Sequence, residues 1–207
     1  MYQNVWHMSN FVQLPEPQKD LTFPLMKAIE KRRTKRKWKM DSLSQQDISN
    51  ILWVACGQTM EETTRSKSRR TVPSSRNSQT IKVYVATDKG LFSYDENSHG
   101  LHLIKSDDIR EGLTNQKMMK NMPIGLIYVS DFSKLKGYVG TDDNRKLFVA
   151  GTETGFISQN VYLYCASAGL NTAVIGLVNR DELHKTMGLV GHEKVIYTQA
   201  IGKSLDD

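Results

Sequence analysis

An apolar segment late in the chain, residues 155–176, constrains the fold more than any other stretch. Between Val161 and Ala168 only Ser167 lacks an apolar body, so a helix here has no polar face for water. Such a helix belongs inside a core or in a subunit interface. Gly169 follows where a left-handed residue often ends a helix. We therefore predict a core or interface helix that ends at Gly169.

A short apolar run closed by a glycine, Ala173 to Gly176, follows this helix. Glycine has no Cβ, so a flat ligand can approach the backbone closely there. The simpler interpretation is a core helix followed by a core strand without a ligand. This stretch alone favours the simpler interpretation, and only the upstream motifs change the balance.

The length and charge of the chain limit the classes of protein to which it can belong. The 207 residues suggest one domain with a single sizeable core, and 39% hydrophobic residues is ordinary for a soluble protein. The formal net charge of +6 is concentrated in two basic runs, residues 31–39 and 65–76. A local basic cluster indicates an anionic ligand as readily as nucleic acid.

Cysteine, histidine and hydropathy patterns argue against a metal site, a disulfide framework and a membrane span. Cys56 and Cys165 fall on apolar helical faces far apart in sequence, which predicts two buried free thiols. The five histidines show no paired ligand spacing on a helix. No apolar run is long enough to span a bilayer, and the N-terminus lacks a signal-like core. We expect a cytoplasmic protein, and the sequence leaves open whether a leader was removed.

Capping signals and apolar spacing predict further helices over residues 24–31, 44–57, from 106 onward, and 179–188. In the first of these, Leu25, Ala28 and Ile29 share the face expected to point inward. The second has a strong start, because Ser44 and Asp47 have the spacing of a capping pair.

Alternating or continuous apolar residues predict strands over residues 80–87, 91–94, 101–104, 124–129 and 195–201. Turns separate the first three strands, which predicts an antiparallel meander, and the continuous run 124–129 is expected at the centre of the sheet. Residues 1–20 are predicted to form an irregular N-terminal extension, 58–80 a long loop, and 21–207 the main domain. Because no βαβ repeat is visible, the fold class is α+β.

The first basic run contains three guanidinium groups and a hydroxyl within five residues: Arg32, Arg33, Thr34 and Arg36. Arginine forms bidentate, charge-assisted hydrogen bonds with phosphate, each worth roughly 1.5–3 kcal/mol when shielded from water. The alternatives are a solvated surface and a nucleic-acid patch. Interleaved aromatic residues, typical of single-strand binders, are scarce here, since only Trp38 interrupts the run.

A second candidate motif, residues 73–79, directly precedes a predicted strand. A proline followed by small hydroxyl residues gives a rigid loop with exposed amides and short hydrogen-bond donors. A plain approach to a hairpin explains the same residues, so this motif is weak evidence by itself.

Taken together, three segments resemble the motifs of the FMN-dependent nitroreductase family, in the same order and with similar spacing. Residues 31–38 resemble its phosphate-binding motif, 73–79 its second motif, and 159–176 the core helix and the turn that faces the flavin ring. The resemblance covers about residues 20–203. Residues 43–53 and Ile175 before Gly176 are most similar to the branch with the SagB-type, thiazole-forming dehydrogenases.

The resemblance implies a nitroreductase-like homodimer with a mostly antiparallel sheet and an FMN in each of two sites shared between subunits. On this basis Arg32, Arg33 and Thr34 would bind the flavin phosphate. Arg36 would reach the phosphate or the pyrimidine edge, and Lys203 would be a late phosphate ligand.

The remaining contacts implied by the family come from the other two motifs. Pro73, Ser74, Ser75 and Asn77 of the second motif would approach the ring and ribityl chain bound mainly by the other subunit. The backbone of residues 175–176 would present an amide to flavin N5. The resemblance calls for no metal, nucleic-acid or membrane partner, and no side chain is assigned as a catalytic acid or base.

The implied activity is hydride transfer from NAD(P)H through flavin N5 to a nitroaromatic, a quinone or a similar conjugated acceptor. Three departures from the family pattern put the substrate in question more than the cofactor. Thr80-Ile81 stand where many relatives have Pro-Trp, Ile175 stands where classical nitroreductases have Glu, and no second basic residue follows Lys203. Open alternatives are a SagB-like dehydrogenase that oxidises an azoline-type substrate, a non-catalytic flavin-binding protein, and a basic nucleic-acid-binding module.

Overall fold

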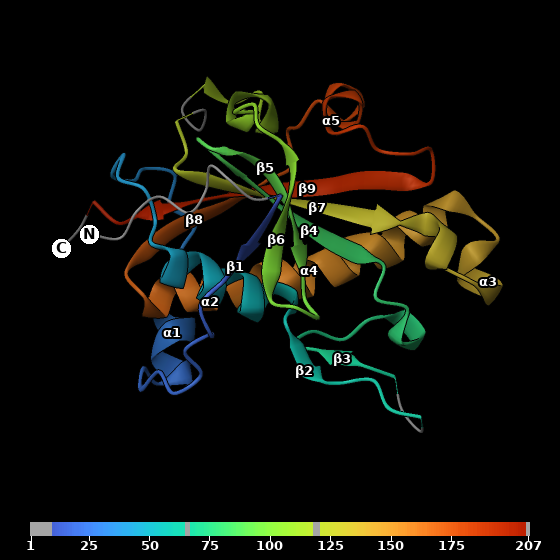
Figure 1. Ribbon diagram of the computed structural model, residues 1–207, viewed down its shortest axis with the longest axis horizontal. Helices are drawn as coiled ribbons and strands as arrows, with labels where there is room; N and C mark the ends of the chain where they lie inside the picture. The colour runs from blue at the N-terminus through green and yellow to red at the C-terminus, as the bar shows by residue number, and fades with distance from the viewer. Residues whose placement is uncertain (1–9, 65–66, 118–120, 206–207) are drawn as a thin grey trace.

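A seven-stranded antiparallel sheet forms the centre of the protein in the computed structural model, which describes residues 10–64, 67–117 and 121–205 (Figure 1). The order across the sheet is β1-β6-β5-β4-β7-β9-β8. The strands are β1 (Phe11–Gln13), β4 (Ile81–Thr87), β5 (Gly90–Asp95), β6 (Gly100–Lys105), β7 (Ile124–Asp131), β8 (Leu170–Ile175) and β9 (Glu193–Lys203). The predicted α+β class, the antiparallel meander β4-β5-β6 and the interior position of β7 are confirmed.

Strand β7 is buried along its whole length, because it lies between β4 and β9 and both of its faces are covered. A continuous apolar run is the pattern expected of such a strand. Helices α2 (Gln45–Cys56) and α4 (Asp143–Ser167) cover one face, where Leu52, Tyr128 and Val161 belong to one buried cluster. Helix α5 (Arg180–Met187) covers the other, where Ile127 and Leu183 belong to a second (Figure 1).

The predicted apolar helix is the C-terminal third of α4, a helix of 25 residues. It begins after Asp142, whose side chain accepts a hydrogen bond from the backbone N–H of Arg145, and it ends before Gly169, which has φ +69° as predicted. Large apolar side chains also remain on its surface, with Phe148 78% exposed and Phe156 44% exposed. Helix α4 therefore carries more apolar surface than one chain covers.

Two capping predictions are confirmed in detail. The side chains and backbone N–H groups of Ser44 and Asp47 form a reciprocal capping box at the start of α2. Asn179 accepts from the backbone N–H of Glu182 at the start of α5, and Gly188 ends that helix in the left-handed region at φ +66°. The predicted burial of both thiols, Cys56 and Cys165, is confirmed as well.

The helix predicted from Ser106 onward was wrong. The chain begins there with two bends and the 3₁₀ helix η3 (Arg110–Leu113) in place of an α-helix. The carboxylate of Asp108 accepts from the backbone and side chain of Arg110, whose guanidinium also donates to the carbonyl of Met122. These contacts fix an irregular turn in place of a regular helical start.

The inward face predicted for helix α1 (Leu25–Lys31) was largely wrong. Ala28 is buried, but Leu25 is 63% exposed and Ile29 is 47% exposed. Helix α1 packs on α4 through one narrow stripe. Its outer apolar residues are left for solvent or for another chain.

The segments predicted to be irregular contain some regular structure. Strand β1 pairs with β6, and residues 58–80 include the short antiparallel pair β2 (Gln58–Met60) and β3 (Arg69–Arg70) and the 3₁₀ turn η2 (Ser75–Asn77). The 3₁₀ turn η5 (Phe132–Lys134) and helix α3 (Gly137–Gly140) precede α4. These pieces are too short to produce a periodic pattern. Residues 1–9 of the proposed extension lie outside the described part, and the division at residue 20 stays a prediction.

Among the described residues, no helix has the length and hydrophobicity to cross a bilayer. That same part of the chain holds no cluster of three or more His, Cys, Asp or Glu side chains arranged to bind a metal ion.

Candidate functional site

The first basic run lies against strand β8. The backbone N–H of Lys35 donates to the carbonyl of Thr172 at 3.1 Å, and the side-chain amide of Asn171 donates to the carbonyl of Lys37 at 2.7 Å. Further along, the N–H of Lys39 donates to the carbonyl of Lys203 at 3.0 Å. The run is therefore held in one conformation beside the ends of β8 and β9.

Tyr162 of α4 connects this run to both the core helix and the strand. Its hydroxyl lies 3.0 Å from the Thr34 hydroxyl and accepts from the backbone N–H of Val174 at 3.0 Å. The guanidinium of Arg32 lies over the Tyr162 ring, 5.4 Å from its centroid. One side chain thus fixes the relative positions of the first motif and β8.

The arginines of the first motif are available to an anion. Arg33 donates to the carbonyls of Glu30 and Arg32, both at 2.8 Å. Within the described residues, no carboxylate forms an ion pair with Arg32, Arg33 or Arg36, or with Lys203. A dianionic phosphate would meet cationic donors that no acid in the described part of the chain neutralises.

A small cavity of about 220 Å³ adjoins the run, lined by residues that include Arg33, Tyr162, Asn171 and Ser204. Pockets that enclose a whole drug-sized ligand measure roughly 300–1,000 Å³. This cavity therefore fits the phosphate end of a larger ligand.

Strand β8 ends at Ile175, and Gly176 directly follows it on the surface. The backbone of Gly176 lies outside the left-handed region, and a Cβ placed there would meet only the Tyr197 ring, at an ordinary 3.6 Å. The protein itself therefore does not require glycine at this position. A close approach by a ligand would give a reason for it.

The second motif is held by a buried carboxylate. Glu153 of α4 is 3% exposed, and it accepts from the backbone N–H of Ser75 at 2.6 Å and from the Thr80 hydroxyl at 3.0 Å. Burial raises the pKa of Glu153 although these hydrogen bonds oppose the rise.

The loop around η2 adopts an unusual backbone. Arg76, Asn77 and Gln79 all have positive φ angles of 53°, 54° and 49°. The Ser74 hydroxyl accepts from the Gln79 N–H at 3.0 Å, and the Asn77 amide donates to the carbonyl of Ser68 at 2.8 Å. Three strained non-glycine residues persist only where surrounding contacts determine the conformation, and such segments cluster at functional sites.

Within one chain the structure brings the first and third motifs together and leaves the second apart. Glu153 and Tyr162, which contact the second and first motifs, are nine positions apart on α4, or about 14 Å along its axis. Arg32, Thr34 and β8 meet around Tyr162, and Lys203 joins them through Lys39. Pro73, Ser74, Ser75 and Asn77 do not reach this group.

Comparison with known proteins identifies the family. The model of the nitroreductase family matches residues 29–203, which is most of the chain. The chain belongs to the nitroreductase family. A crystal structure from Ralstonia eutropha JMP134, assigned as a nitroreductase, is 30% identical, with 96% of this chain and 91% of that chain covered and a TM-score of 0.84.

More distant matches are consistent with this membership. A Methanocaldococcus jannaschii protein, also assigned as a nitroreductase, is 24% identical over 94% of this chain and 97% of its own length. A chain in the Escherichia coli microcin synthetase McbBCD complex with truncated pro-MccB17 bound is 19% identical, with 86% of this chain and 73% of that chain covered and a TM-score of 0.68. At that identity the likeness shows the nitroreductase fold alone. The chain therefore belongs to a family of oxidoreductases whose members are generally flavin-dependent.

The sequence did not predict two residues that hold the candidate site together, Tyr162 and Glu153. In the sequence, Tyr162 contributes to the apolar pattern of the core helix, and that pattern does not indicate a role for its hydroxyl. The signal available was a phenol in an otherwise apolar helix, which must find a hydrogen-bond partner when buried. Glu153 gave no signal, because an acid in a mixed helical segment is usually exposed.

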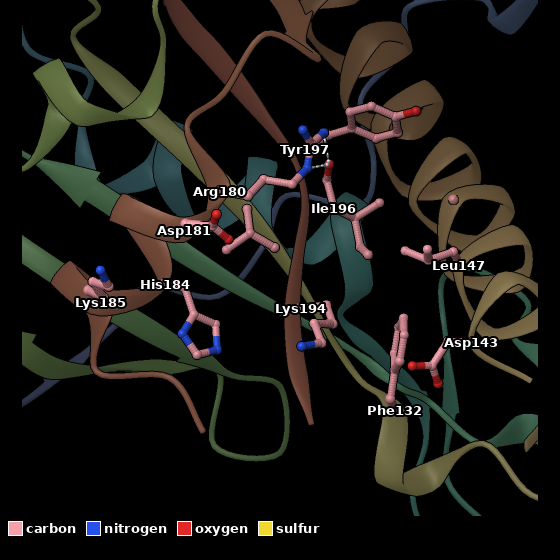
Figure 2. Close-up of a pocket in the computed structure, with 12 residues that line it drawn as sticks. Phe132, Asp143, Leu147, Arg180, Asp181, His184, Lys185, Lys194, Ile196 and Tyr197 are labelled. Atoms are coloured by element: carbon pink, nitrogen blue, oxygen red, sulfur yellow. Dashed lines mark hydrogen bonds between the residues drawn. The ribbon is translucent and has the colours of Figure 1, made fainter. Parts of the chain in front are cut away.

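The nitroreductase chain also contains a second, larger cavity of about 910 Å³ between α4, α5 and the start of β9 (Figure 2). Arg180 lies at its border and donates to the carbonyl of Gly176 at 3.3 Å. The cavity therefore adjoins the turn that the sequence predicts to face the flavin ring.

Proposed function

We propose that this protein is an FMN-dependent oxidoreductase that transfers hydride from NAD(P)H to a nitroaromatic, a quinone or a similar conjugated acceptor. The observation that carries the proposal is the Tyr162 network. It joins Thr34, Val174 near the end of β8, and Arg32, which has no carboxylate partner among the described residues. Family membership supplies the oxidoreductase class.

The residues of this network suit the phosphate end of FMN. Arg32, Arg33, Thr34 and Arg36 would hold the phosphate, with Lys203 at the exit of β9 as an additional cation. The absence of competing carboxylates among the described neighbours supports this assignment. A nucleic-acid patch is disfavoured because the run is fixed against β8 beside a small cavity.

The other end of FMN would lie near residues 175–176, where the backbone N–H would face N5. When bound, FMN supplies the two-electron chemistry, accepting a hydride from reduced nicotinamide and passing it to the acceptor. The chain contributes position and charge: Arg36 would stabilise negative charge near the pyrimidine edge. We assign no side chain as a general acid or base.

We propose a homodimer in which the second motif completes the site of the other subunit. The second motif, which includes Pro73, Ser74, Ser75 and Asn77, is anchored at Glu153, about 14 Å along α4 from the anchor of the first motif at Tyr162. The exposed apolar residues of α4 and α1 provide surface for an interface, which we expect to exceed about 2,000 Å² in total. We place this dimer in the cytoplasm.

The visible absorption spectrum of the purified protein is the first test. A flavoprotein is yellow, whereas a nucleic-acid-binding module is colourless. Anaerobic mixing with NADH or NADPH then separates an enzyme from a flavin-storage protein, because only the enzyme bleaches. A colourless protein that does not bind added FMN would refute the proposal.

Gly176→Val tests the turn at the end of β8. Because the fold has room for a side chain beside Tyr197, we expect the variant to remain a folded dimer that binds FMN poorly or is reduced slowly. Thermal unfolding, flavin content and anaerobic reduction rate are measured on the same sample. A folded variant with normal flavin content and normal reduction would remove this turn from the site.

A further inference from the structure

The large cavity exists because two neighbouring strands have unequal lengths. Strand β8 ends at Ile175, opposite Thr198, whereas β9 begins five residues earlier, at Glu193. Residues 193–197 therefore lack a β8 partner. Arg180 fills part of the gap, and its guanidinium donates to the carbonyl of Ile196 at 2.7 and 3.2 Å.

One wall of the cavity is apolar. The pairing of β7 with β9 shifts register between Val195 and Tyr197. Val195 packs in the core on the α5 side, while Ile196 and Tyr197 both pack with the core on the α4 side. Ile196 and Tyr197 line the cavity together with Phe132 and Leu147, and these side chains present flat and branched apolar groups to it (Figure 2). Such a wall suits a conjugated ring.

Positive charge lies beside these apolar groups, with the Arg180 guanidinium 5.9 Å from the centroid of the Tyr197 ring. Arg180, Lys185 and Lys194 line the cavity, and Figure 2 shows Lys194 and His184 extending toward one another. Neither Lys185 nor Lys194 forms an ion pair within the described part of the chain.

The two acids in the cavity wall do not neutralise these cations equally. Asp143 is paired with Lys146 at 2.8 Å, and this contact, with a smaller effect of the Lys194 charge, lowers the pKa of its carboxyl. Asp181 lies in the first turn of α5, next to Arg180 in the chain. With three cations against these two acids in its lining, the cavity attracts an anionic group.

We propose that this cavity binds an acceptor that carries a carboxylate on a conjugated ring, with the ring on Tyr197 and the carboxylate at Lys194. The proposal deepens the proposed function and rests on it for the role of the ligand as acceptor. The binding itself requires only the cavity. It predicts that anionic aromatic compounds bind better than neutral ones of the same shape.

The test compares 4-nitrobenzoate with its neutral analogue 4-nitrobenzamide by calorimetry on the protein as purified. We expect 4-nitrobenzoate to bind at least about fivefold more tightly, since a charge-assisted hydrogen bond contributes more than a neutral one. Lys194→Gln should remove that preference and leave 4-nitrobenzamide binding within about twofold. The matched control is Lys105→Gln, which removes one exposed charge on β6, far across the sheet, and should preserve the preference.

Three results would overturn the proposal: no preference in the wild type, an unchanged preference in Lys194→Gln, or an equal loss in Lys105→Gln. A fourth is a Lys194→Gln protein whose selectivity for NADPH over NADH falls while 4-nitrobenzoate binding is unchanged. The cations of the cavity would then bind the phosphate of the reductant and not the carboxylate of an acceptor. Because binding is measured without turnover, a protein that binds 4-nitrobenzoate selectively but holds no flavin would refute only the proposed function.

Discussion

Helix α4 holds the first motif through Tyr162 and the second motif through Glu153, and the two positions differ in how they use charge. At the Tyr162 end, a phenol holds Thr34 and Arg32, and Arg32 has no carboxylate partner among the described residues. At the Glu153 end, a buried carboxylate satisfies the backbone of a strained loop. The guanidinium at the Tyr162 end stays available to a ligand, while the carboxylate at the Glu153 end forms hydrogen bonds within the protein. Binding capacity and structural support can therefore be tested separately on one helix.

The largest effect is expected from Glu153→Ala. This change leaves the N–H of Ser75 and the hydroxyl of Thr80 without their buried acceptor, and removes packing at a site that is 3% exposed. We expect a loss of about 2–3 kcal/mol in the free energy of unfolding. Denaturant titration measures it. A variant as stable as the wild type would show that the second motif does not depend on this carboxylate.

Arg32→Ala should have the opposite profile, with a change in ligand binding and little change in stability. Arg32 is half-buried over Tyr162 and has no described ion pair to lose. Removing one charge-assisted donor to a dianion should weaken FMN binding by at least about tenfold. Flavin fluorescence titration gives the Kd. Purification with full flavin occupancy would exclude Arg32 from the phosphate site.

Tyr162→Phe should affect both properties by a smaller amount. It keeps the ring under Arg32 but removes the acceptor of the Val174 N–H and the partner of Thr34. The expected costs are about 1 kcal/mol in stability and a few-fold in FMN affinity. Thermal unfolding and the Kd are measured together. The nearby Tyr164→Phe variant, which loses a hydrogen bond to Asn50, should reduce stability alone.

The smallest effect concerns pH. The pKa of Glu153 is raised in the folded protein, so the folded state binds more protons than the unfolded state between the ordinary carboxyl pKa of 4.5 and the raised value. The free energy of unfolding should therefore fall as pH rises through that window. Glu153→Gln, which cannot ionise, should lose this part of the pH dependence. An identical slope in the two proteins would contradict the assignment.

The sequence predicted the fold well wherever the signal was local. The capping pair Ser44–Asp47, the left-handed Gly169 and the continuous run of β7 each depend on a few neighbouring residues. The helix expected at Ser106 failed because Arg110 finds partners twelve and thirteen residues later, at Met122 and Pro123. Contacts of that range leave no periodic pattern.

The candidate site was predictable only in part. Segment order gave the family, which the family match confirms, and basic composition indicated an anion. The individual site residues stay predictions, because neither the fold nor the similar proteins test a cofactor contact. Tyr162 and Glu153 could not be assigned from spacing, since their roles depend on which residues of other segments the fold brings to α4.

The position of the basic run beside β8 has a consequence for solubility. Strand β8 is the last strand of the sheet, and an unprotected last strand can recruit strands from other molecules. Lys35 occupies the outward carbonyl of Thr172, and Tyr162 occupies the outward N–H of Val174. The segment that carries the proposed phosphate-binding residues, together with Tyr162, thus also shields the sheet from intermolecular pairing. Variants that displace this segment should form aggregates as well as lose their ligand.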